Sequence, residues 1–317
     1  MSNLSHSSNQ GTPVLIICGP TASGKTALAL RLAVASAKAG QFTSIISADS
    51  RQVYRGLDVL TGKDIPPEKA SLRLFGLDLI YPDQTMNAGQ YSAYARKVIA
   101  KEIKENRQVI VVGGTGFYLT ALTQPASLAG VGPDEKLRQE LNPLSLGELQ
   151  QRLKVIDPGR LAAMNQSDVA NPRRLIRAIE IASASIRPIS PIGPLRPISF
   201  SWLGIRIPLV KLRERIERRV HDRLDHGAVA EVENLLKNYP DQNLPVYTTL
   251  GVKPILRYLA GEISRAQARQ LWTTEEVRYA KRQLTWFAKQ SSIIWYDQDR
   301  ISSLSFKYNY DQQKGDR

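Results

Sequence analysis

The sequence predicts an α/β protein, with a mostly parallel sheet flanked by helices and an all-helical subdomain inserted into it. Continuous apolar runs at 12–19, 43–49 and 107–116 alternate with helical segments, which is typical of parallel strands buried on both faces. Polar helical segments replace this pattern over 127–199, and an apolar stretch returns near residue 200. These observations indicate one sheet-based core that is interrupted by an insertion.

Each element of the core follows from a local pattern. The first apolar run leads through a glycine-rich loop into an Ala/Leu-rich helix over 25–40, and a second helix is expected around 91–106. A helix over 209–226 carries apolar residues at every fourth position, and the chain beyond it is expected to be helical to about residue 290. The apolar segment 292–297 is expected to add a late strand.

The expected domain organisation is a split core. Residues 12–126 and 200–300 are predicted to form it, and 127–199 to form the inserted helical subdomain. A proline-rich stretch at 184–201 forbids regular helix and is expected to act as a linker. The two ends are expected to be a disordered tail over 1–11 and a frayed C-terminus over 301–317.

The composition favours a folded protein with a polyanionic partner. Of 317 residues 42% are apolar, and 43 Lys and Arg against 29 Asp and Glu give a formal charge of +14. A generally basic solvated surface is the alternative reading of this charge. The single cysteine, Cys18, excludes a disulfide framework and a thiolate metal cluster, and its apolar surroundings predict a core residue. No signal peptide or membrane-spanning run is found, so a cytoplasmic protein without a membrane partner is expected.

The strongest motif is GPTASGKT, which joins the first strand to the first helix. It fits G-x-x-x-x-G-K-[ST], a loop whose backbone amides and following helix N-terminus hold phosphate groups. Lys25 would supply a point charge, and the Thr26 hydroxyl could hold Mg²⁺. The motif predicts a phosphate site without identifying the molecule that bears the phosphates. Its residues are Gly19, Pro20, Thr21, Ala22, Ser23, Gly24, Lys25 and Thr26.

Two other strand ends are expected at the same edge of the sheet. Asp49 and Ser50 follow the second strand, where open α/β sheets bind ligands, although a cap or turn role is the alternative. After the third strand stands a glycine-rich turn, 113–116, where a nucleotide hydrolase often has an acidic residue. These glycines would permit either close approach of a ligand or a tight strand-to-helix turn.

Basic residues gather on three later helical segments. In the helix over 209–226, Arg215 and Arg219 share a face and could reach a leaving diphosphate, with a solvated basic face as the alternative. The segment 171–180 places three arginines on one short helix. The segment 278–287 mixes basic and aromatic residues, which suits stacking on unpaired bases, although its aromatic residues are more often core.

Six blocks in order resemble the tRNA dimethylallyltransferase family of bacterial type. They are GPTASGKT, ADSRQVYRGLD, VVGGTGFYLTAL, NPRRLIRAIE, LRERIERRV and RYAKRQLTWF. The resemblance runs from about residue 12 to about residue 296. It implies a P-loop-type core with an inserted helical domain. It also implies transfer of a dimethylallyl group from its diphosphate to N6 of adenosine 37, next to the anticodon of tRNAs.

The resemblance assigns roles to residues. Asp49 matches the family's catalytic aspartate, so it would act as general base for the adenine amine, with Thr115 near the reacting adenosine. The loop amides, Lys25, Mg²⁺ on Thr26 and Arg215 or Arg219 would stabilise the departing diphosphate. The residues implied to contact tRNA are Asp49, Ser50, Arg51, Gln52, Thr115, Arg138, Arg173, Arg174, Leu175, Ile176, Arg177, Thr248, Thr249, Leu250, Gly251, Val252 and Lys253.

Three stretches depart from the usual family pattern. The segment 61–64 reads TGKD instead of T-A-K-P, and 73–76 reads RLFG where a His-His-Leu stretch is usual. Val252 stands where the family commonly has Tyr in Gly-Tyr-Lys. These departures bear on the shape of the prenyl pocket and on RNA contacts, and not on the class of reaction.

Two other functions stay open on the sequence. An RNA-associated P-loop ATPase or kinase would use the same loop for ATP, but the expected acid after the third strand is missing. A prenyltransferase of free adenine nucleotides would share the chemistry of the first 120 residues, but the basic insertion and Arg-rich second half favour a large RNA. Because one chain supplies a whole site, a monomer is expected.

Overall fold

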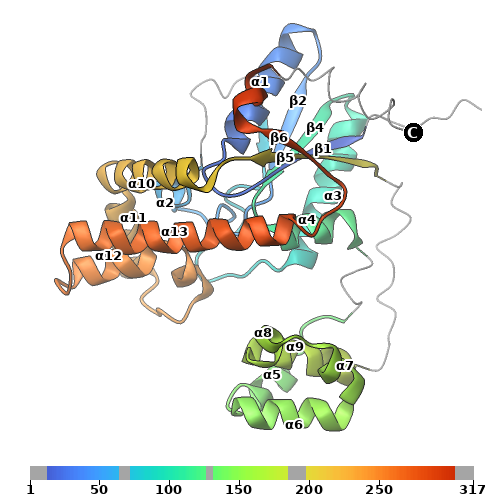
Figure 1. Ribbon diagram of the computed structural model, residues 1–317, viewed down its shortest axis with the longest axis vertical. Coiled ribbons are helices and arrows are strands. Elements are labelled where there is room, and N and C mark those ends of the chain that lie inside the picture. Colours follow the sequence, from blue (N-terminus) through green and yellow to red (C-terminus); the bar gives the residue numbers. More distant parts are fainter. Residues whose placement is uncertain (1–12, 64–71, 126–130, 185–197, 304–317) are drawn as a thin grey trace, which may run out of the picture. The chain divides into compact units, whose positions relative to one another are not determined.

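The computed structural model describes residues 13–63, 72–125, 131–184 and 198–303. Contacts between Cα atoms divide the chain into two compact units. The first contains Met1–Thr123 and Pro197–Arg317, and the second contains Gln124–Arg196. Figure 1 shows the helices and strands of both units.

The first unit is built on a six-stranded sheet in the order β3-β2-β4-β1-β5-β6. The strands are β1 (Val14–Cys18), β2 (Thr43–Ser47), β3 (Arg73–Phe75), β4 (Gln108–Gly113), β5 (Phe200–Arg206) and β6 (Ile293–Asp297). All five neighbouring pairs are parallel. The predicted fold class, a mostly parallel sheet flanked by helices, is therefore confirmed.

The strand register brings three loops to one edge of the sheet. Cys18, the last residue of β1, pairs with Gly113 of β4, and Ser47 of β2 pairs with Val112. Because the strands are parallel, the segments that follow β1, β2 and β4 leave from neighbouring points. Chain order reverses direction around β1, which is the position where open α/β sheets form a ligand crevice.

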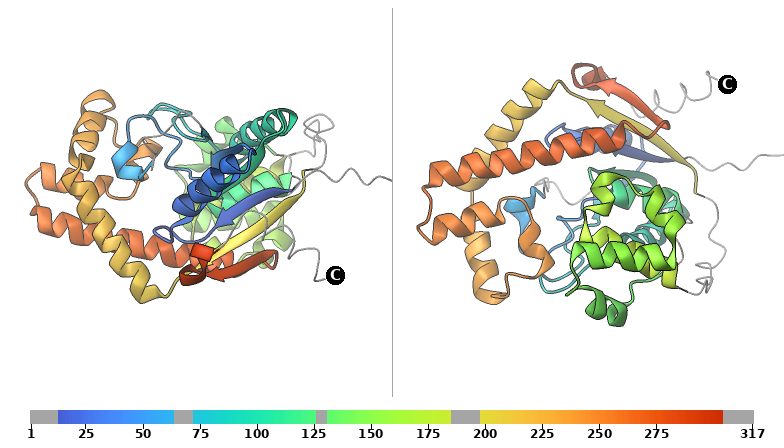
Figure 2. Two further views of the ribbon diagram at one scale, coloured as in Figure 1. Left: turned by 90° about the horizontal axis from the view of Figure 1, so that it is seen from above. Right: turned by 60° about the horizontal axis from the view of Figure 1, so that its bottom comes forward.

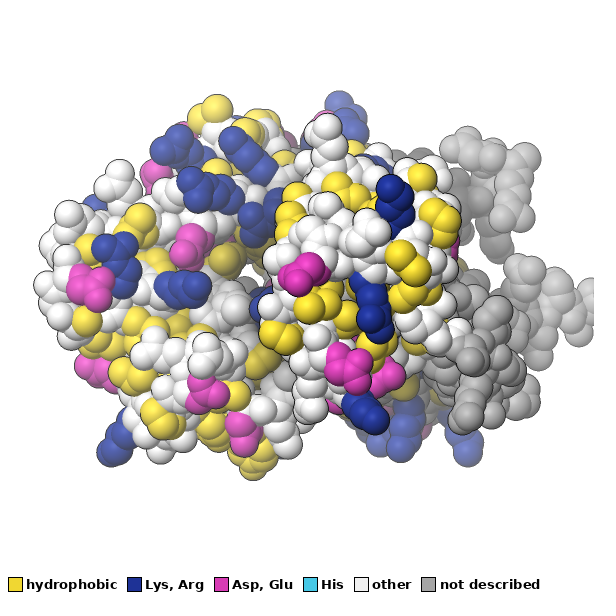
Figure 3. Space-filling view, turned by 90° about the horizontal axis from the view of Figure 1, so that it is seen from below, with side chains coloured by type: hydrophobic (Ala, Val, Ile, Leu, Met, Phe, Trp, Pro, Cys, Tyr) yellow, Lys and Arg dark blue, Asp and Glu magenta, His cyan; other side chains and the backbone are white. Residues whose placement is uncertain are grey.

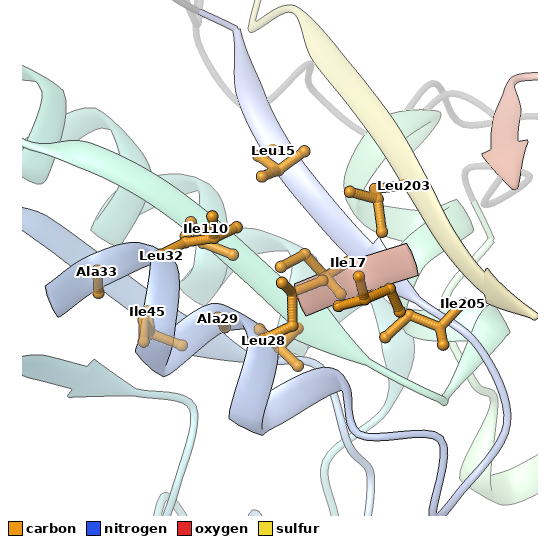
Figure 4. Packing of buried hydrophobic residues seen from close by; sticks show 12 residues of the cluster. Leu15, Ile17, Leu28, Ala29, Leu32, Ala33, Ile45, Ile110, Leu203 and Ile205 are labelled. Carbon is orange, nitrogen blue, oxygen red and sulfur yellow. The ribbon is translucent and has the colours of Figure 1, made fainter. Parts of the chain in front are cut away.

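The core lies between the sheet and the helices on its two faces. Helix α1 (Lys25–Lys38) lies along one face of the sheet (Figure 2). It buries Leu28 and Leu32 against Ile17 and other residues of that face, as Figure 4 shows. Side chains alternate along a strand, so Ile16 points to the opposite face, where it is also fully buried. Each such side chain contributes about 1.5–3 kcal/mol by burial. Burial on both faces explains why β1 reads as a continuous apolar run.

Helices α3 (Ala88–Lys104) and α4 (Gly116–Thr123) pack against each other, and α3 also packs against β4. The Tyr91 and Tyr118 rings stack between them with centroids 4.1 Å apart. Helix α3 begins at Asn87, whose side chain accepts a hydrogen bond from the Gln90 backbone amide in a capping box. The first residues of α4 directly follow the glycine-rich turn after β4.

The C-terminal helices of this unit extend beyond the sheet. They are α10 (Leu209–Asp225), α11 (Ala228–Asn238), α12 (Val252–Leu259) and α13 (Arg265–Phe287), with the short α2 (Asp58–Thr61) and the 3₁₀ helices η3 (Pro245–Thr248) and η4 (Gln298–Ser303). The 23-residue helix α13 packs against α10 and α12 and is the long helix below the sheet in Figure 1. The predicted apolar stripe of α10 is buried, including Leu212, Ile216 and Val220.

The second unit is all helical. Its helices are α5 (Glu135–Leu141), α6 (Leu146–Ile156), α7 (Pro158–Ala163), α8 (Gln166–Val169) and α9 (Pro172–Ser183). Leu149 and Leu153 of α6 pack with Leu175 and Ile179 of α9 in a separate core. Each helix begins at a Ser, Asp or Asn whose side chain accepts a backbone N–H, and such caps contribute about 0.5–2 kcal/mol each. These caps supplement a small core.

The structure corrects the expectation for the C-terminal segment. Ile301 is only 6% exposed and belongs to the core cluster under α1, and its carbonyl accepts a hydrogen bond from the Arg31 guanidinium. The chain is therefore ordered at least to Ser303, beyond the predicted start of fraying at 301. The predicted tail at 1–11 and most of the predicted linker at 184–201 lie outside the described residues. Among the described helices, none is long and apolar enough to cross a membrane.

Candidate active site

A cavity of about 280 Å³ lies within the first unit, at the edge where β1, β2 and β4 end. Its walls come from the loop after β1, the ends of β2 and β4, the segment around β3, and helices α2 and α10. Nine residues that the sequence predicted for the site line it: Thr21, Ala22, Gly24, Lys25, Thr26, Asp49, Gln52, Arg215 and Arg219. The structure thus brings together residues that are nearly 200 positions apart in the chain.

The glycine-rich loop has the shape of an anion cradle. Gly24 adopts φ 92°, a left-handed conformation that favours glycine, directly before α1 begins at Lys25. No side chain among the described residues caps this helix end, so its amides are open to an anion. Gly19, Pro20 and Ser23 do not line the cavity, and Ser23 is 1% exposed. These three residues shape the loop, while the other five face the cavity.

Lys25 is held across its own loop. Its Nζ donates a hydrogen bond to the Pro20 carbonyl at 2.7 Å. Burial lowers the pKa of Lys25 to about 8, because desolvation disfavours the ammonium, while the Asp49 carboxylate acts in the opposite direction. A phosphate group beside this ammonium would raise the pKa again, because an anion favours the charged form.

Two arginines of α10 share one carboxylate from α13. Arg219 Nη2 donates to Glu276 Oε2 at 2.8 Å and to the Thr21 hydroxyl at 2.6 Å, so this guanidinium is tied to the glycine-rich loop. Arg223 Nη1 donates to the other oxygen of Glu276 at 3.3 Å, and Glu276 is 4% exposed. Arg215 also lines the cavity, and within the described part of the chain its side chain has no hydrogen-bonded partner. The cavity therefore has a cationic end.

The acidic group of the site is Asp49, two residues beyond β2. Its Oδ1 accepts a hydrogen bond from the Arg51 backbone amide at 2.8 Å, which fixes the carboxylate in a turn. Asp49 lines the cavity and is partly exposed. The Ser50 amide donates to the Thr115 hydroxyl at 3.1 Å, so the turn after β2 is bound to the turn after β4. Thr115 itself does not line the cavity.

Helix α13 contributes site residues that sequence reasoning missed. Besides Glu276, they include Tyr279, which forms a hydrogen bond with Thr115. Burial, and next the charge of Asp49, raise the pKa of Tyr279 to about 12. Gln283 is 5% exposed and joins two loops, because it accepts from the Thr21 amide at 2.7 Å and donates to the Gly114 carbonyl at 2.8 Å. Tyr279 and Gln283 lie within the block RYAKRQLTWF, which marked the segment but not these contacts. Polar residues on a buried helical stripe are a further signal.

The glycines after β4 allow close packing within the protein. A Cβ on Gly113 would lie 2.3 Å from the Ala48 carbonyl oxygen, and a Cβ on Gly114 would lie 2.2 Å from Gln283 Nε2. These distances show that both glycines are packed closely against neighbouring parts of the protein. Gly113 and Gly114 also line the cavity, so close approach of a ligand at this turn stays a prediction.

The cavity also has an apolar wall. It is formed by Ile45, Leu74, Phe75, Leu77 and Val112. The RLFG departure therefore forms β3 and supplies this wall. In the TGKD departure, Lys63 is buried, and its ammonium donates to the Tyr54 carbonyl at 2.6 Å and to Asp58 and Asp78 at 2.7 and 2.5 Å. This lysine holds the wall segments together.

Gln52 and Arg51 have partners within the first unit. Gln52 accepts from the Ser47 hydroxyl at 2.7 Å and donates to the Gly62 carbonyl at 2.7 Å, so both ends of its amide are used in the wall. Arg51 Nη1 donates to the Pro245 carbonyl at 3.3 Å. Both residues are partly exposed.

The residues predicted to contact RNA in the helical unit differ in exposure. Arg138 and Arg177 both bind the buried Glu180, and Arg174 pairs with Asp168. Arg173 is exposed and has no ion pair among the described residues. Leu175 and Ile176 are 0% and 7% exposed in the core of the unit, so their side chains stabilise it and cannot reach RNA.

The predicted segment 248–253 lies where η3 meets α12. Thr248 and Lys253 are exposed, Leu250 is half-buried, and Thr249, Gly251 and Val252 are buried. A Cβ on Gly251 would lie 2.4 Å from the Trp272 ring. Val252, the departure from the usual tyrosine, is fully buried.

Charge and metal capacity follow from this distribution. On the face in Figure 3, basic side chains are interspersed with acidic and apolar ones, so no single patch there carries the net charge of +14. Among the described residues, no group of three His, Cys, Asp or Glu could hold a metal ion. Thr26 and Asp49 line one cavity with the phosphate loop, and Mg²⁺ commonly takes one or two protein oxygens beside phosphates and water. The cavity fits such an ion bound together with phosphates.

A profile of the IPP transferase family matches residues 52–290. The chain belongs to the IPP transferase family. A protein of Synechocystis sp. named tRNA dimethylallyltransferase is 34% identical over 294 residues, which cover 92% of this chain and 93% of that relative. A protein of Pelotomaculum thermopropionicum with the same name is 36% identical over 296 residues, which cover 91% and 92%. The resemblance recognised in the six sequence blocks is confirmed.

Solved structures of the IPP transferase family agree with this fold. The tRNA isopentenylpyrophosphate transferase of Bacillus halodurans has a TM-score of 0.67 at 28% identity, with 95% of this chain and 96% of that chain covered. A eukaryotic dimethylallyltransferase, described as acting on tRNA, has a TM-score of 0.74 at 21% identity, with 95% and 77% covered. At that identity the second likeness supports the fold alone.

Proposed function

We propose that this protein transfers a dimethylallyl group from dimethylallyl diphosphate to N6 of adenosine 37 in tRNA, which gives N6-dimethylallyladenosine and diphosphate. The observation that carries the proposal is one cavity that is lined both by a phosphate loop with arginines and by an apolar wall. A prenyl diphosphate has a matching anionic part and apolar part. Two relatives of this protein are named tRNA dimethylallyltransferase, which supports a dimethylallyl group as the group transferred and tRNA as its acceptor.

The donor diphosphate is held at the cationic end. Negative charge develops on the diphosphate when the allylic C–O bond breaks. The groups that would stabilise it are the loop amides before α1, the Lys25 ammonium and the guanidiniums of Arg215 and Arg219. Thr26 would hold Mg²⁺, which would supply further positive charge for the leaving group. The prenyl tail lies on the apolar wall that includes Leu74 and Phe75.

Asp49 accepts the proton. The adenine N6 lone pair attacks C1 of the dimethylallyl group, the C1–O bond electrons leave with the diphosphate, and an N6 proton passes to the Asp49 carboxylate. The hydrogen bond that the Arg51 backbone amide donates to Asp49 Oδ1 keeps the carboxylate oriented. Thr115 and Tyr279 support the turn next to it. The target adenine has to leave the anticodon-loop stack to enter this cavity.

The tRNA is proposed to contact exposed basic residues, of which Arg173 and Lys253 are free to do so. Binding through such residues is electrostatic and falls with salt. A monomer is proposed, as the sequence predicted. A tRNA acceptor also agrees with the expected cytoplasmic location.

An ATPase or kinase is the weaker candidate. Such an enzyme often has an acid directly after the apolar strand beside its phosphate loop, to hold the metal or orient the nucleophile. β4 ends at Gly113 and Gly114 follows it, so no acid stands at that place. The hydrophilic triphosphate of ATP would also make no use of the apolar wall.

The function is tested by product analysis. Dimethylallyl diphosphate with a ¹⁴C-labelled prenyl group, or γ-labelled ATP, is incubated with unmodified tRNA or with free AMP. The RNA is then digested and its nucleosides are separated. Label in N6-dimethylallyladenosine from the prenyl donor and tRNA is the expected result. Label transferred from ATP would establish the kinase instead, and prenylation of AMP without tRNA would establish the free-nucleotide enzyme.

A further inference from the structure

Gln283 joins the loop after β1 to the loop after β4. It belongs to α13, and its side chain lies 262 positions along the chain from Thr21 and 169 from Gly114. With 5% exposure it is shielded from solvent, and it sits between the buried Ala280 and Phe287 on the same helix. A rigid helix therefore anchors this one side chain against two separate loops.

The two contacts allow only one orientation of the amide. Thr21 offers a backbone N–H, which can only donate, and Gly114 offers a carbonyl, which can only accept. The Gln283 oxygen must therefore face Thr21 and its nitrogen must face Gly114. Of the twenty side chains, glutamine has the length and the paired acceptor and donor for both. Gly114 leaves the space, because a Cβ there would lie 2.2 Å from the nitrogen.

The two loops carry opposite halves of the reaction that the proposed function requires. Thr21 lines the cavity and its hydroxyl accepts from Arg219, so it belongs to the diphosphate side. Gly114 precedes Thr115, whose hydroxyl accepts from the Ser50 amide beside Asp49, so it belongs to the amine side. The separation of these loops sets the distance between the leaving group and the proton acceptor.

We propose that Gln283 is a positioning residue. It fixes the separation between the loop after β1, on the diphosphate side, and the loop after β4, on the amine side. It acts through Thr21 and Gly114 and does not itself line the cavity. This inference rests on the proposed function. Displacement of reacting groups by about 1 Å costs on the order of 100-fold in rate. The contacts proposed to bind the donor alone, or the tRNA alone, do not bridge the two loops that Gln283 joins.

Gln283→Met removes both hydrogen bonds at nearly constant size. Single-turnover rates with saturating donor and tRNA are expected to fall by about 10- to 100-fold. The dissociation constants for donor and for tRNA, measured separately, are expected to stay near the wild-type values. Gln270→Met is the matched control, because Gln270 lies exposed on the same helix, and it should leave the rate unchanged.

Gln283→Glu provides a signature that a purely structural role would not produce. The carboxylate can still accept from Thr21, but at neutral pH its second oxygen faces the Gly114 carbonyl and repels it. Protonation would restore a donor at that position. The ratio of the variant's rate to the wild-type rate is therefore expected to rise as pH is lowered.

Several results would overturn the inference. A Gln283→Met rate equal to wild type, or a weaker donor affinity with an unchanged rate, would show that Gln283 does not set the separation. A Gln283→Glu rate ratio that does not change with pH would show the same, and it decides the question if the Met variant does not fold. Wild-type protein that prenylates no tRNA would instead refute the proposed function on which the inference depends.

Discussion

Glu276→Gln tests whether one buried carboxylate organises the cationic end of the cavity. Glu276 is 4% exposed and accepts from Arg219 at 2.8 Å and Arg223 at 3.3 Å, and it thereby joins α10 to α13. Glutamine has nearly the same shape but no charge. It can accept from one guanidinium only, and its amide N–H groups face the other.

The expected cost follows from these contacts. Removing one partner of a buried ion pair costs about 3–5 kcal/mol, and we expect the lower end because glutamine retains one acceptor. For a unit of more than 200 residues, each kcal/mol lowers the midpoint of thermal unfolding by roughly 2–4 °C, so a decrease of roughly 6 °C or more is expected.

Diphosphate should partly restore the variant. A bound anion lies near Arg219, where it replaces the missing negative charge, whereas in the wild type it is repelled by Glu276. Thermal unfolding followed by circular dichroism, with and without inorganic diphosphate, should show a larger increase for Glu276→Gln than for wild type. The matched control is Glu217→Gln, which breaks an exposed pair with Arg213 and should change little.

The reasoning would be refuted by a variant that unfolds at the wild-type temperature. It would also be refuted if diphosphate raised the midpoints of variant and wild type equally. The first result would mean that Glu276 does not compensate the two arginines. The second would mean that the anion does not bind next to Arg219.

Three further predictions concern the donor and the RNA. Because burial lowers the pKa of Lys25 to about 8, its ammonium is lost as pH rises through that value, so donor affinity measured by calorimetry should fall above pH 8 by up to about tenfold per pH unit. Lys25→Arg should remove this dependence, and a wild-type affinity that is flat to pH 10 would contradict it. Leu74→Ala should weaken binding of dimethylallyl diphosphate by about tenfold through lost apolar contact, with inorganic diphosphate unaffected. An equal loss of affinity for both ligands would show that the dimethylallyl tail does not lie on the wall that includes Leu74. Arg173→Ala should weaken tRNA binding and reduce its salt dependence, while Arg257→Ala, an exposed residue paired with Glu262, serves as control. Weaker donor binding alone in the Arg173 variant would place the RNA surface elsewhere.

Local patterns were sufficient to predict the core of the fold. The phosphate loop and α1 were identified because loop shape and helix start depend on adjacent residues, above all Gly24 and Lys25. The buried stripe of α10 was identified because Leu212 and Ile216 are four positions apart on one helix. β3 was missed because three residues are too few to show a period, and only one of them, Arg73, is clearly polar.

The contribution of α13 could not be predicted from local patterns. Glu276 and Gln283 bind residues more than 50 and 160 positions away, and which residues they meet depends on how α13 packs. A partial signal was present, since both lie on the stripe that also buries Trp272 and Phe287. Polar residues on a buried stripe require hydrogen-bonded partners, although the stripe cannot identify them.

Family blocks also include residues that serve the fold. Leu175 and Ile176 stand within the Arg-rich block of α9, and the block as a whole was predicted to contact RNA. Their apolar side chains, with Ile179 one turn further, form the buried face of the helix. Helical periodicity therefore distinguishes these buried residues from the exposed Arg173 of the same block.

The most direct test of the proposed mechanism is the rate of label transfer by Asp49→Ala. The variant removes the carboxylate that lines the cavity and leaves the basic surface and the phosphate loop in place. Transfer of labelled dimethylallyl groups to tRNA is measured at saturating substrates, with tRNA binding measured in parallel. The account predicts that tRNA binding is retained and transfer is lost. Transfer at the wild-type rate would contradict it.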